Sequence, residues 1–232
     1  MRFFGLVHVP PAAPPAAELS PAKTTGAAAW PVDHFVGRAS ALKLGLWVFI
    51  LSDAFSFAGL LLSYGVLRAA SATWWTAGEP PLGIGFTAGL TFLLICSSVT
   101  MVLAVSAARF GNRREAVIFL GLTALGGLLF LAGQYHEYFG IVGEGLVGAG
   151  LSFGQSHRAT TFFAITSFHG AHVATGVFLL LLTLARTAKN RDVRAETDRI
   201  ESVGLFWHFV DLVWILVFTF VYLLPGGPGG AP

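Results

Sequence analysis

Five long apolar stretches constrain the fold of this chain more than any other feature of its sequence. They run over about Leu44–Leu67, Ile84–Ala108, Ala116–Gly133, Thr160–Leu184 and Val203–Leu224. Each is long enough to cross a hydrocarbon core about 30 Å thick, and lipid offers the backbone no hydrogen bonds, so each is predicted to be a transmembrane helix. The 232 residues are 55% hydrophobic and only 11% charged, which is unlike a soluble domain. The predicted fold class is an all-α integral membrane protein with five transmembrane helices in a bundle.

Charge and composition predict how the chain is divided and oriented. Residues 1–40 are predicted to be a flexible Ala/Pro-rich arm, residues 41–225 the membrane domain, and residues 226–232 a flexible tail. When the loops are assigned alternately to two sides, all of the 14 Lys and Arg residues except Arg68 and Arg158 fall on one side. The positive-inside rule then predicts a cytoplasmic N-terminus and a periplasmic C-terminus. The net charge of +2 indicates no basic face for nucleic acid.

Several polar side chains lie where lipid is expected. They are Asp53, Gln134, Glu137, His169, His172, His208 and Asp211. A charge at the bilayer centre costs at least about 2.5–3.5 kcal/mol, so these groups should face the bundle and find partners. His169 with His172, and His208 with Asp211, are i,i+3 pairs that should each share a helix face. Estimated depths allow Asp53, His172 and Asp211 to form a carboxyl–imidazole cluster that joins the first, fourth and fifth helices.

Three interpretations of the histidines follow from the residues alone. They could be structural groups satisfied inside the bundle, parts of a proton path, or haem ligands, with His172 and His208 as the two axial imidazoles of a haem b. A haem b electron carrier and a proton-coupled transporter therefore both stay open. No HxxxH or CxxC motif is present, which disfavours a zinc or copper site. The lone Cys96 is predicted to be a buried structural thiol.

Several motifs in series resemble one family. The segments TTFFAITSFHGAHVATG and FWHFVDLVWILVFTFVYLL resemble the last two helices of haem–copper oxidase subunit III, the cytochrome c oxidase subunit III family. The segment KLGLWVFILSDAFSF resembles its helix with a buried acid after serine, EPPLGIGFTAGLTFLLICSSVT its Pro-Pro loop and following helix, and GQYHEYF its Q-x-x-E-Y ending. The resemblance runs from about Lys43 to Leu224 and is closest to the five-helix bacterial type. The matching motif residues are Gln134, Tyr138, Phe168, Gly170, Trp207 and Trp214.

The resemblance implies an accessory role without redox chemistry. Such a subunit would pack directly against subunit I of a terminal oxidase in a bacterial inner membrane, in a complex with subunit II, a small subunit IV and, in some assemblies, a respiratory supercomplex. It would support proton uptake and the stability of the catalytic subunit and would bind phospholipid. Haems and copper would belong to the partner subunits, and no residue of this chain would be catalytic.

The same resemblance implies roles for individual residues. His169 and His172 would be polar groups inside the bundle, and Gly170 with Ala174 would let helices approach closely. Asp53 is the best candidate for a protonatable site, either as a functional group or as a carboxyl that pins helices together. Many cytochrome c oxidase members have glutamate there, and aspartate is also typical of the quinol-oxidase branch. Cytochrome c is the favoured electron donor, with quinol as the alternative.

Overall fold

The computed structural model describes residues 41–71, 74, 82–140, 145–190 and 192–224. The predicted arm and tail lie outside these residues. The helices are α1 (Ala41–Ala70), α2 (Ile84–Phe110), α3 (Arg113–Phe139), α4 (His157–Lys189) and α5 (Thr197–Val217), with a 3₁₀ turn η1 (Val193–Glu196) before α5 and a π-helical turn η2 (Phe218–Leu223) after it. The described residues form five helical segments long and apolar enough to cross a membrane, which confirms the predicted all-α membrane fold.

The helices begin and end at residues suited to capping. Gly111 ends α2 with a φ of 80°, a left-handed conformation that favours glycine, and its N–H bonds back to the last turn of α2. Asn112 follows at once, and its side chain accepts a hydrogen bond from the backbone N–H of Glu115 at the start of α3. Ser156 caps α4 by accepting from the N–H of Ala159 at 3.0 Å. The connection between α2 and α3 is therefore only two residues long.

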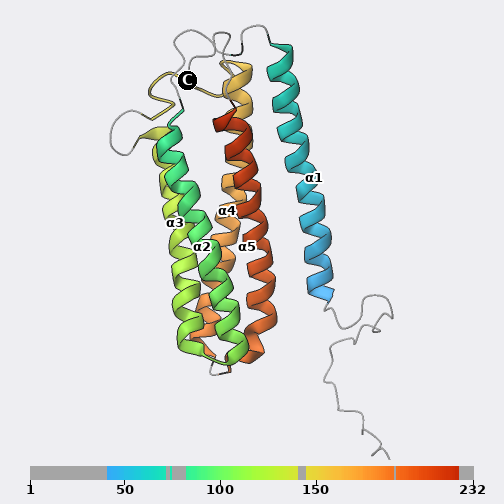
Figure 1. Cartoon of the computed structure of the whole chain (residues 1–232), viewed down its shortest axis with the longest axis vertical. Coiled ribbons are helices and arrows are strands. Elements are labelled where there is room, and N and C mark those ends of the chain that lie inside the picture. The colour runs from blue at the N-terminus through green and yellow to red at the C-terminus, as the bar shows by residue number, and fades with distance from the viewer. Residues whose placement is uncertain (1–40, 72–73, 75–81, 141–144, 191, 225–232) are drawn as a thin grey trace, which may run out of the picture. The chain divides into compact units, whose positions relative to one another are not determined.

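The described helices differ strongly in how far they are buried. Figure 1 shows α2, α3, α4 and α5 side by side, with α1 next to this group, where it contacts α4 and α5. We compare the apolar stretch of 18 residues within each span. In the span that contains α5, 56% of these residues are buried, whereas in the span of α1 only 11% are buried. The helix α5 is thus the centre of the packing, and α1 is its edge.

Two tryptophans of α5 fill the core. Trp207 is fully buried and packs where α3 and α4 come close, because a Cβ added at Gly127 would lie 2.5 Å from its ring and one at Gly176 would lie 2.9 Å from it. Trp214 meets Phe130 edge to face, with ring centroids 4.8 Å apart. Of the two small residues predicted to let helices approach, Gly170 does face α3, because an added Cβ there would lie 3.0 Å from Gln134 Oε1. Ala174 is exposed, and the second close approach is at Gly176. A small residue helps packing only where it faces another helix.

The prediction for Cys96 was wrong. The thiol is exposed on α2 rather than buried in the core. The helix α2 is apolar on all sides, because some of its residues face other helices and others face lipid. Apolar neighbours in the sequence therefore do not show on which side a residue lies.

Candidate functional site

Asp53 of α1 and His172 of α4 form a polar pair near the middle of the membrane, called here the peripheral pair. The carboxyl Oδ1 lies 3.2 Å from the imidazole Nε2. The other ring nitrogen, Nδ1, donates to the backbone carbonyl of Phe168 at 2.7 Å. Because Nδ1 carries a proton, a neutral His172 offers Nε2 only as an acceptor. The contact therefore needs one further proton, held either by the carboxyl or by the imidazole. Asp53 and His172, two members of the predicted carboxyl–imidazole cluster, are thus brought together in the structure.

The peripheral pair lies in an apolar aromatic setting close to the surface of the bundle. The ring of Phe57 packs 5.3 Å from the imidazole and that of Phe168 packs 4.6 Å from it. The side chains of Asp53 and His172 are 8% and 16% exposed. The second carboxyl oxygen, Oδ2, has no hydrogen-bond partner among the described residues. Chemically, this is a site that can hold a proton at mid-membrane depth.

The neighbouring histidine, His169, has a different environment. It is fully buried, and its ring stacks on Trp214 with centroids 4.8 Å apart and planes at 30°. Phe130 approaches it edge-on at 5.8 Å. Neither ring nitrogen has a hydrogen-bond partner within the described part of the chain. The two histidines therefore do not act as one unit, since the angular offset of three residues turns His169 toward α5 and His172 toward α1.

Glu137 joins three elements at one end of the bundle. Thr87 of α2 donates to Oε1 at 3.1 Å, and Tyr222 of η2 donates to Oε2 at 3.1 Å. Both carboxyl oxygens of this α3 residue are thus bonded inside the protein. The neighbouring Gln134 donates to the backbone carbonyl of Thr166 on α4 at 2.7 Å. This part of the predicted site is a set of hydrogen bonds between helices.

The other family-motif residues also connect helices. The indole N–H of Trp207 donates to Ser97 Oγ at 3.1 Å, and that of Trp214 donates to Thr91 Oγ1 at 3.0 Å. Both bonds join α5 to α2. The remaining members of the motif lie on α3 and α4: Tyr138, which shares a short hydrogen bond with Thr166; Phe168, beside the peripheral pair; and Gly170, against the side chain of Gln134.

His208 and Asp211 do not join the peripheral pair. His208 bonds through Nδ1 to Ser98 Oγ of α2 at 2.6 Å. Asp211 is 5% exposed, and its carboxyl lies next to the hydroxyl of the same Ser98. The predicted cluster across the first, fourth and fifth helices was therefore right for Asp53 and His172 and wrong for Asp211. Sequence depth does not reveal which neighbour a side chain faces.

The geometry does not favour His172 and His208 as the axial ligands of one haem. His172 is bonded to Asp53 of α1 and to its own helix, whereas His208 is bonded to Ser98 of α2. The two imidazoles thus turn toward different helices. Among the residues that the structure describes, no three His, Cys, Asp or Glu side chains come together in a way that could hold a metal ion.

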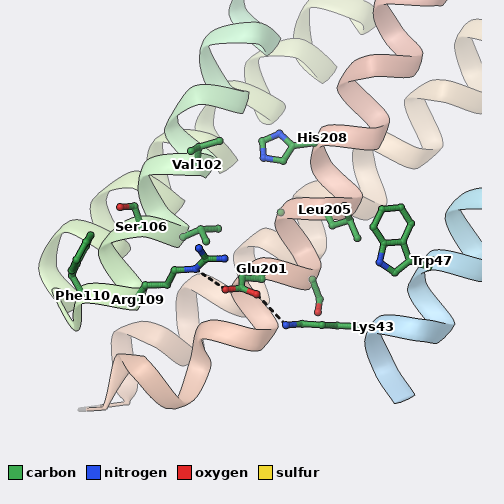
Figure 2. A pocket seen from close by; sticks show the side chains of 12 residues that line it. Lys43, Trp47, Val102, Ser106, Arg109, Phe110, Glu201, Leu205 and His208 are labelled. Atoms are coloured by element: carbon green, nitrogen blue, oxygen red, sulfur yellow. Dashed lines mark hydrogen bonds and ion pairs between the residues drawn. The ribbon is translucent and has the colours of Figure 1, made fainter. Parts of the chain in front are cut away.

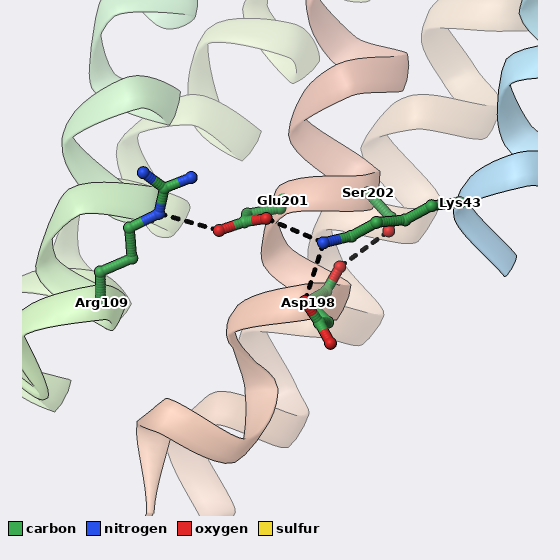
Figure 3. A network of polar contacts seen from close by, with 5 residues as sticks. All are labelled: Lys43, Arg109, Asp198, Glu201 and Ser202. Atoms are coloured by element: carbon green, nitrogen blue, oxygen red, sulfur yellow. Dashed lines mark hydrogen bonds and ion pairs between the residues drawn. The ribbon is translucent and has the colours of Figure 1, made fainter. Parts of the chain in front are cut away.

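An ion network at the other end of α5 was missed by the sequence reasoning. Glu201 receives Lys43 Nζ of α1 at 3.0 Å and Arg109 Nε of α2 at 2.8 Å, and Lys43 also reaches Asp198 at 2.8 Å (Figure 3). This ion network connects α1, α2 and α5 near one membrane surface. A signal was present, because Lys43 and Arg109 were assigned to the same side and two acids begin the fifth span.

Two grooves flank α1. The first, of about 560 Å³, runs between α1, α2 and α5 from the ion network to His208, and Figure 2 shows Arg109 and Glu201 at one end and His208 at the other. The second, of about 420 Å³, lies between α1, α4 and α5; its lining is mostly apolar and includes Arg186 and Arg199. Both grooves face the surroundings of the bundle and are suited to elongated apolar molecules or helices.

These features define a multi-pass helical membrane protein in which most polar side chains connect helices. The profile of the family described as cytochrome c oxidase subunit III matches residues 25–225. The chain is 34% identical over 205 residues to the probable cytochrome c oxidase subunit 3 of Mycobacterium tuberculosis, covering 87% of this chain and 97% of that protein. It is 34% identical to the cytochrome c oxidase subunit 3 of Corynebacterium diphtheriae, covering 82% and 91% of the two chains. The chain belongs to the cytochrome c oxidase subunit III family.

A third relative belongs to a different oxidase. The cytochrome bo(3) ubiquinol oxidase subunit 3 of Pseudomonas aeruginosa is 31% identical over 194 residues, covering 83% of this chain and 89% of that protein. Family membership makes the chain an accessory subunit III of a haem–copper oxidase, which is a non-catalytic subunit of the respiratory complex. It is a multi-pass membrane protein, and its bacterial relatives imply the inner membrane.

Proposed function

We propose that this subunit supports proton uptake and preserves the active state of the catalytic subunit, with the peripheral pair as its protonatable site. The supporting observation is the contact of Asp53 Oδ1 with His172 Nε2 at 3.2 Å, which requires one proton in addition to that on Nδ1. The pair is held on one side by α1, the least buried helix. A proton can therefore be gained or lost there without unpacking the core.

The substitution Asp53→Asn tests this proposal in the assembled oxidase. Asparagine keeps nearly the same size and can still bond to His172, but it cannot ionise. We expect normal haem content, with lower turnover at high pH or fewer turnovers before inactivation. The effect should be modest, since the catalytic groups lie in another subunit. Oxygen consumption is measured against pH together with the number of turnovers before inactivation.

A second buried carboxyl provides the matched control. Both oxygens of Glu137 are bonded inside the chain, so Glu137→Gln should leave the pH profile and the active lifetime unchanged. An Asp53→Asn enzyme that matches wild type in both measurements would make Asp53 a purely structural residue and would refute the proposed role.

We further propose that the complex contains subunit I as the direct partner, with subunits II and IV, and takes electrons from cytochrome c. The names of the Mycobacterium and Corynebacterium relatives favour cytochrome c, and the name of the Pseudomonas relative keeps ubiquinol as the alternative. Purification of the tagged chain should recover a haem-containing oxidase that oxidises reduced cytochrome c. Faster oxidation of ubiquinol than of cytochrome c by that complex would reverse this choice.

Phospholipid is the proposed ligand of the second groove. Its walls, which include Leu46, Leu179 and Phe206, suit an acyl chain, and Arg186 at its rim suits a phosphate. Arg186 is exposed and has no side-chain ion pair within the described residues. Mass spectrometry of lipids retained by the purified complex should show loss of a stoichiometric phospholipid in Arg186→Ala but not in Lys189→Ala, a control on the same helix end. Equal retention by both variants would contradict this assignment.

The proposed orientation places the ion network at the cytoplasmic surface. The free thiol of Cys96 is exposed, so labelling begins from a Cys96→Ser chain. Single cysteines replace Arg114, in the first turn of α3, and Phe153, before α4, both of which are exposed. A membrane-impermeant reagent should label position 153 from the periplasm and position 114 only in opened membranes. Labelling of both positions from one side would refute this topology.

A further inference from the structure

The hydroxyl of Ser98 on α2 lies between two titratable side chains of α5. Its Oγ is 2.6 Å from Nδ1 of His208, and it also lies next to the carboxyl of Asp211. The two α5 residues are three positions apart, so their side chains can reach the same point on α2. Asp211 is 5% exposed, whereas His208 is only half-buried. A buried acid is thus connected through one hydroxyl to a more accessible imidazole.

His208 also borders the first groove, which leads to a membrane surface. Figure 2 shows His208 at one end of this groove and the ion network at the other. At ~1.5 Å per residue, His208 lies about 10 Å along α5 from Glu201, and Asp211 lies about 15 Å from it. The polar residues of the lining are Lys43, Ser106, Arg109, Glu201, Ser202 and His208. Polar side chains of this kind in a membrane bundle face cavities that water can fill.

The three side chains can share their protons in two ways. Among the described residues no charged side chain acts on the Asp211 carboxyl, and a buried carboxylate without a cation is costly. The acid therefore carries a proton at rest and donates it to Ser98 Oγ, while Ser98 donates to Nδ1 of His208, whose own proton is on Nε2. In the second arrangement, Nδ1 carries the proton and donates to Ser98, and Ser98 donates to the carboxylate.

We propose that Asp211, Ser98 and His208 form a proton relay between the core of the bundle and the first groove. The O–H bond of the acid breaks as its proton moves to Ser98 Oγ, and the proton of Ser98 moves to Nδ1. The Nε2–H bond then breaks and its proton passes to water in the groove, which leaves a neutral imidazole and a carboxylate. The reverse sequence takes up one proton. This relay goes beyond the proposed function, because it does not involve the peripheral pair.

Hydrogen–deuterium exchange of the Asp211 carboxyl in the intact complex tests the relay. The infrared C=O band that is lost in Asp211→Asn reports the protonated acid, and transfer into D2O shifts this band. Ser98→Ala removes the connecting hydroxyl and should slow the shift roughly a hundred-fold, the lower end of what a positioned proton-transfer group contributes. Ser98→Thr keeps a hydroxyl and should exchange at the wild-type rate. Thr100→Val is the matched control, since the Thr100 hydroxyl contacts Thr123 of α3 instead.

Several results of this measurement would overturn the relay. They are the lack of a C=O band that depends on Asp211, equal exchange in wild type and Ser98→Ala, and equal slowing in Ser98→Ala and Thr100→Val. His208→Phe keeps a ring without nitrogen and tests the imidazole separately, also where Ser98→Ala does not assemble. We expect the same slowing there, and wild-type exchange would contradict the relay. The infrared band does not depend on turnover, so failure of the relay is distinguishable from failure of the proposed function.

Cysteine labelling tests whether water enters the groove. In a Cys96→Ser chain, a single cysteine replaces either Val102, which lines the groove, or Ile118 of α3, which is 48% exposed. Val102 lies further along its helix from the turn between α2 and α3 than Ile118 does. Because a charged reagent attacks the thiolate and needs water, Val102→Cys should nevertheless react several-fold faster. Equal or slower labelling at position 102 would show a dry groove and would overturn the proposed exit of the proton.

Discussion

The peripheral pair and the Glu137 site contain the same kind of chemistry in opposite surroundings. Glu137 has both oxygens bonded, one to Thr87 and one to Tyr222, where α2, α3 and η2 meet. Asp53 has one oxygen near His172 and one without a partner among the described residues, on the least buried helix. A buried carboxyl in a membrane bundle can thus fix helices in place or remain available to a proton. The number of its hydrogen bonds and the burial of its helix distinguish the two cases.

The largest effect is expected in the core, from Gly127→Leu. A Cβ at this position would lie 2.5 Å from both Trp207 and Val177, so a leucine cannot fit without displacing α5. We expect a loss of about 3 kcal/mol, the upper end of the usual cost of overpacking a core, and little folded subunit in membranes, measured by its abundance and its recovery with the oxidase. Gly121→Leu is the control on the same helix, since nothing lies within 4 Å of a Cβ there. Normal accumulation of Gly127→Leu would show that the α5 core is looser than described.

A smaller effect is expected from Glu137→Leu. Thr87 can still donate to the carbonyl of Gly83 at 3.1 Å, but the buried hydroxyl of Tyr222 loses its acceptor. One such unpaired group costs about 1–3 kcal/mol. The thermal unfolding temperature of the purified complex should fall, and Tyr222→Phe in the same chain should recover part of the loss. A double variant no more stable than Glu137→Leu would contradict this account.

Asp53→Leu should destabilise the protein less than Glu137→Leu but impair function more. The substitution leaves only the Nε2 of His172 without its partner, at the edge of the bundle, at about 1 kcal/mol. We expect a small decrease in unfolding temperature together with a larger decrease in active lifetime. The measured quantity is the decrease in active lifetime divided by the decrease in unfolding temperature. This ratio should be larger for Asp53→Leu than for Glu137→Leu. Equal ratios at the two sites would remove the distinction between a structural and a protonatable carboxyl.

The smallest effect is expected from Arg109→Gln at the ion network. The Arg109 side chain is 63% exposed, and such pairs contribute less than about 1 kcal/mol because water and salt screen them. The variant should lose stability slightly at low salt and match wild type at high salt in thermal unfolding. Arg114→Gln, which removes an exposed arginine outside the network, should show no salt-dependent difference. A loss for Arg109→Gln that persists at high salt would indicate a buried role.

The fold could be predicted from the sequence to a large extent. Five apolar stretches in lipid leave only five helices, and all five spans are present. The fifth span begins about ten residues earlier than predicted, at Val193 rather than Val203, because the charged turns around Asp198 and Glu201 continue the helix beyond the hydrocarbon. Hydrophobicity marks the apolar core of a membrane helix and not its polar ends.

The site was predictable only in part, for a geometric reason. The contact between Asp53 and His172 follows from depth and from the need of each group for a partner. The same reasoning placed Asp211 in that cluster, although it faces elsewhere, and treated His169 as equivalent to His172. Residues three apart differ in direction by about 60° on a helix, so the neighbours of each depend on which helices pack beside it. That information comes from tertiary structure and is absent from a helix that is apolar on all sides.

The two-residue turn at Gly111 and Asn112 has a consequence for how the chain enters the membrane. A connection this short makes α2 and α3 a hairpin of local contacts, which can form early. The hydroxyls of Thr91 and Ser97 donate to carbonyls of their own helix, those of Thr87 and Leu94. The hairpin can therefore be inserted with these donors already satisfied. The same oxygens keep lone pairs free for the indole N–H groups of α5, so α5, which is synthesised after this hairpin, completes hydrogen bonds that α2 did not need for insertion.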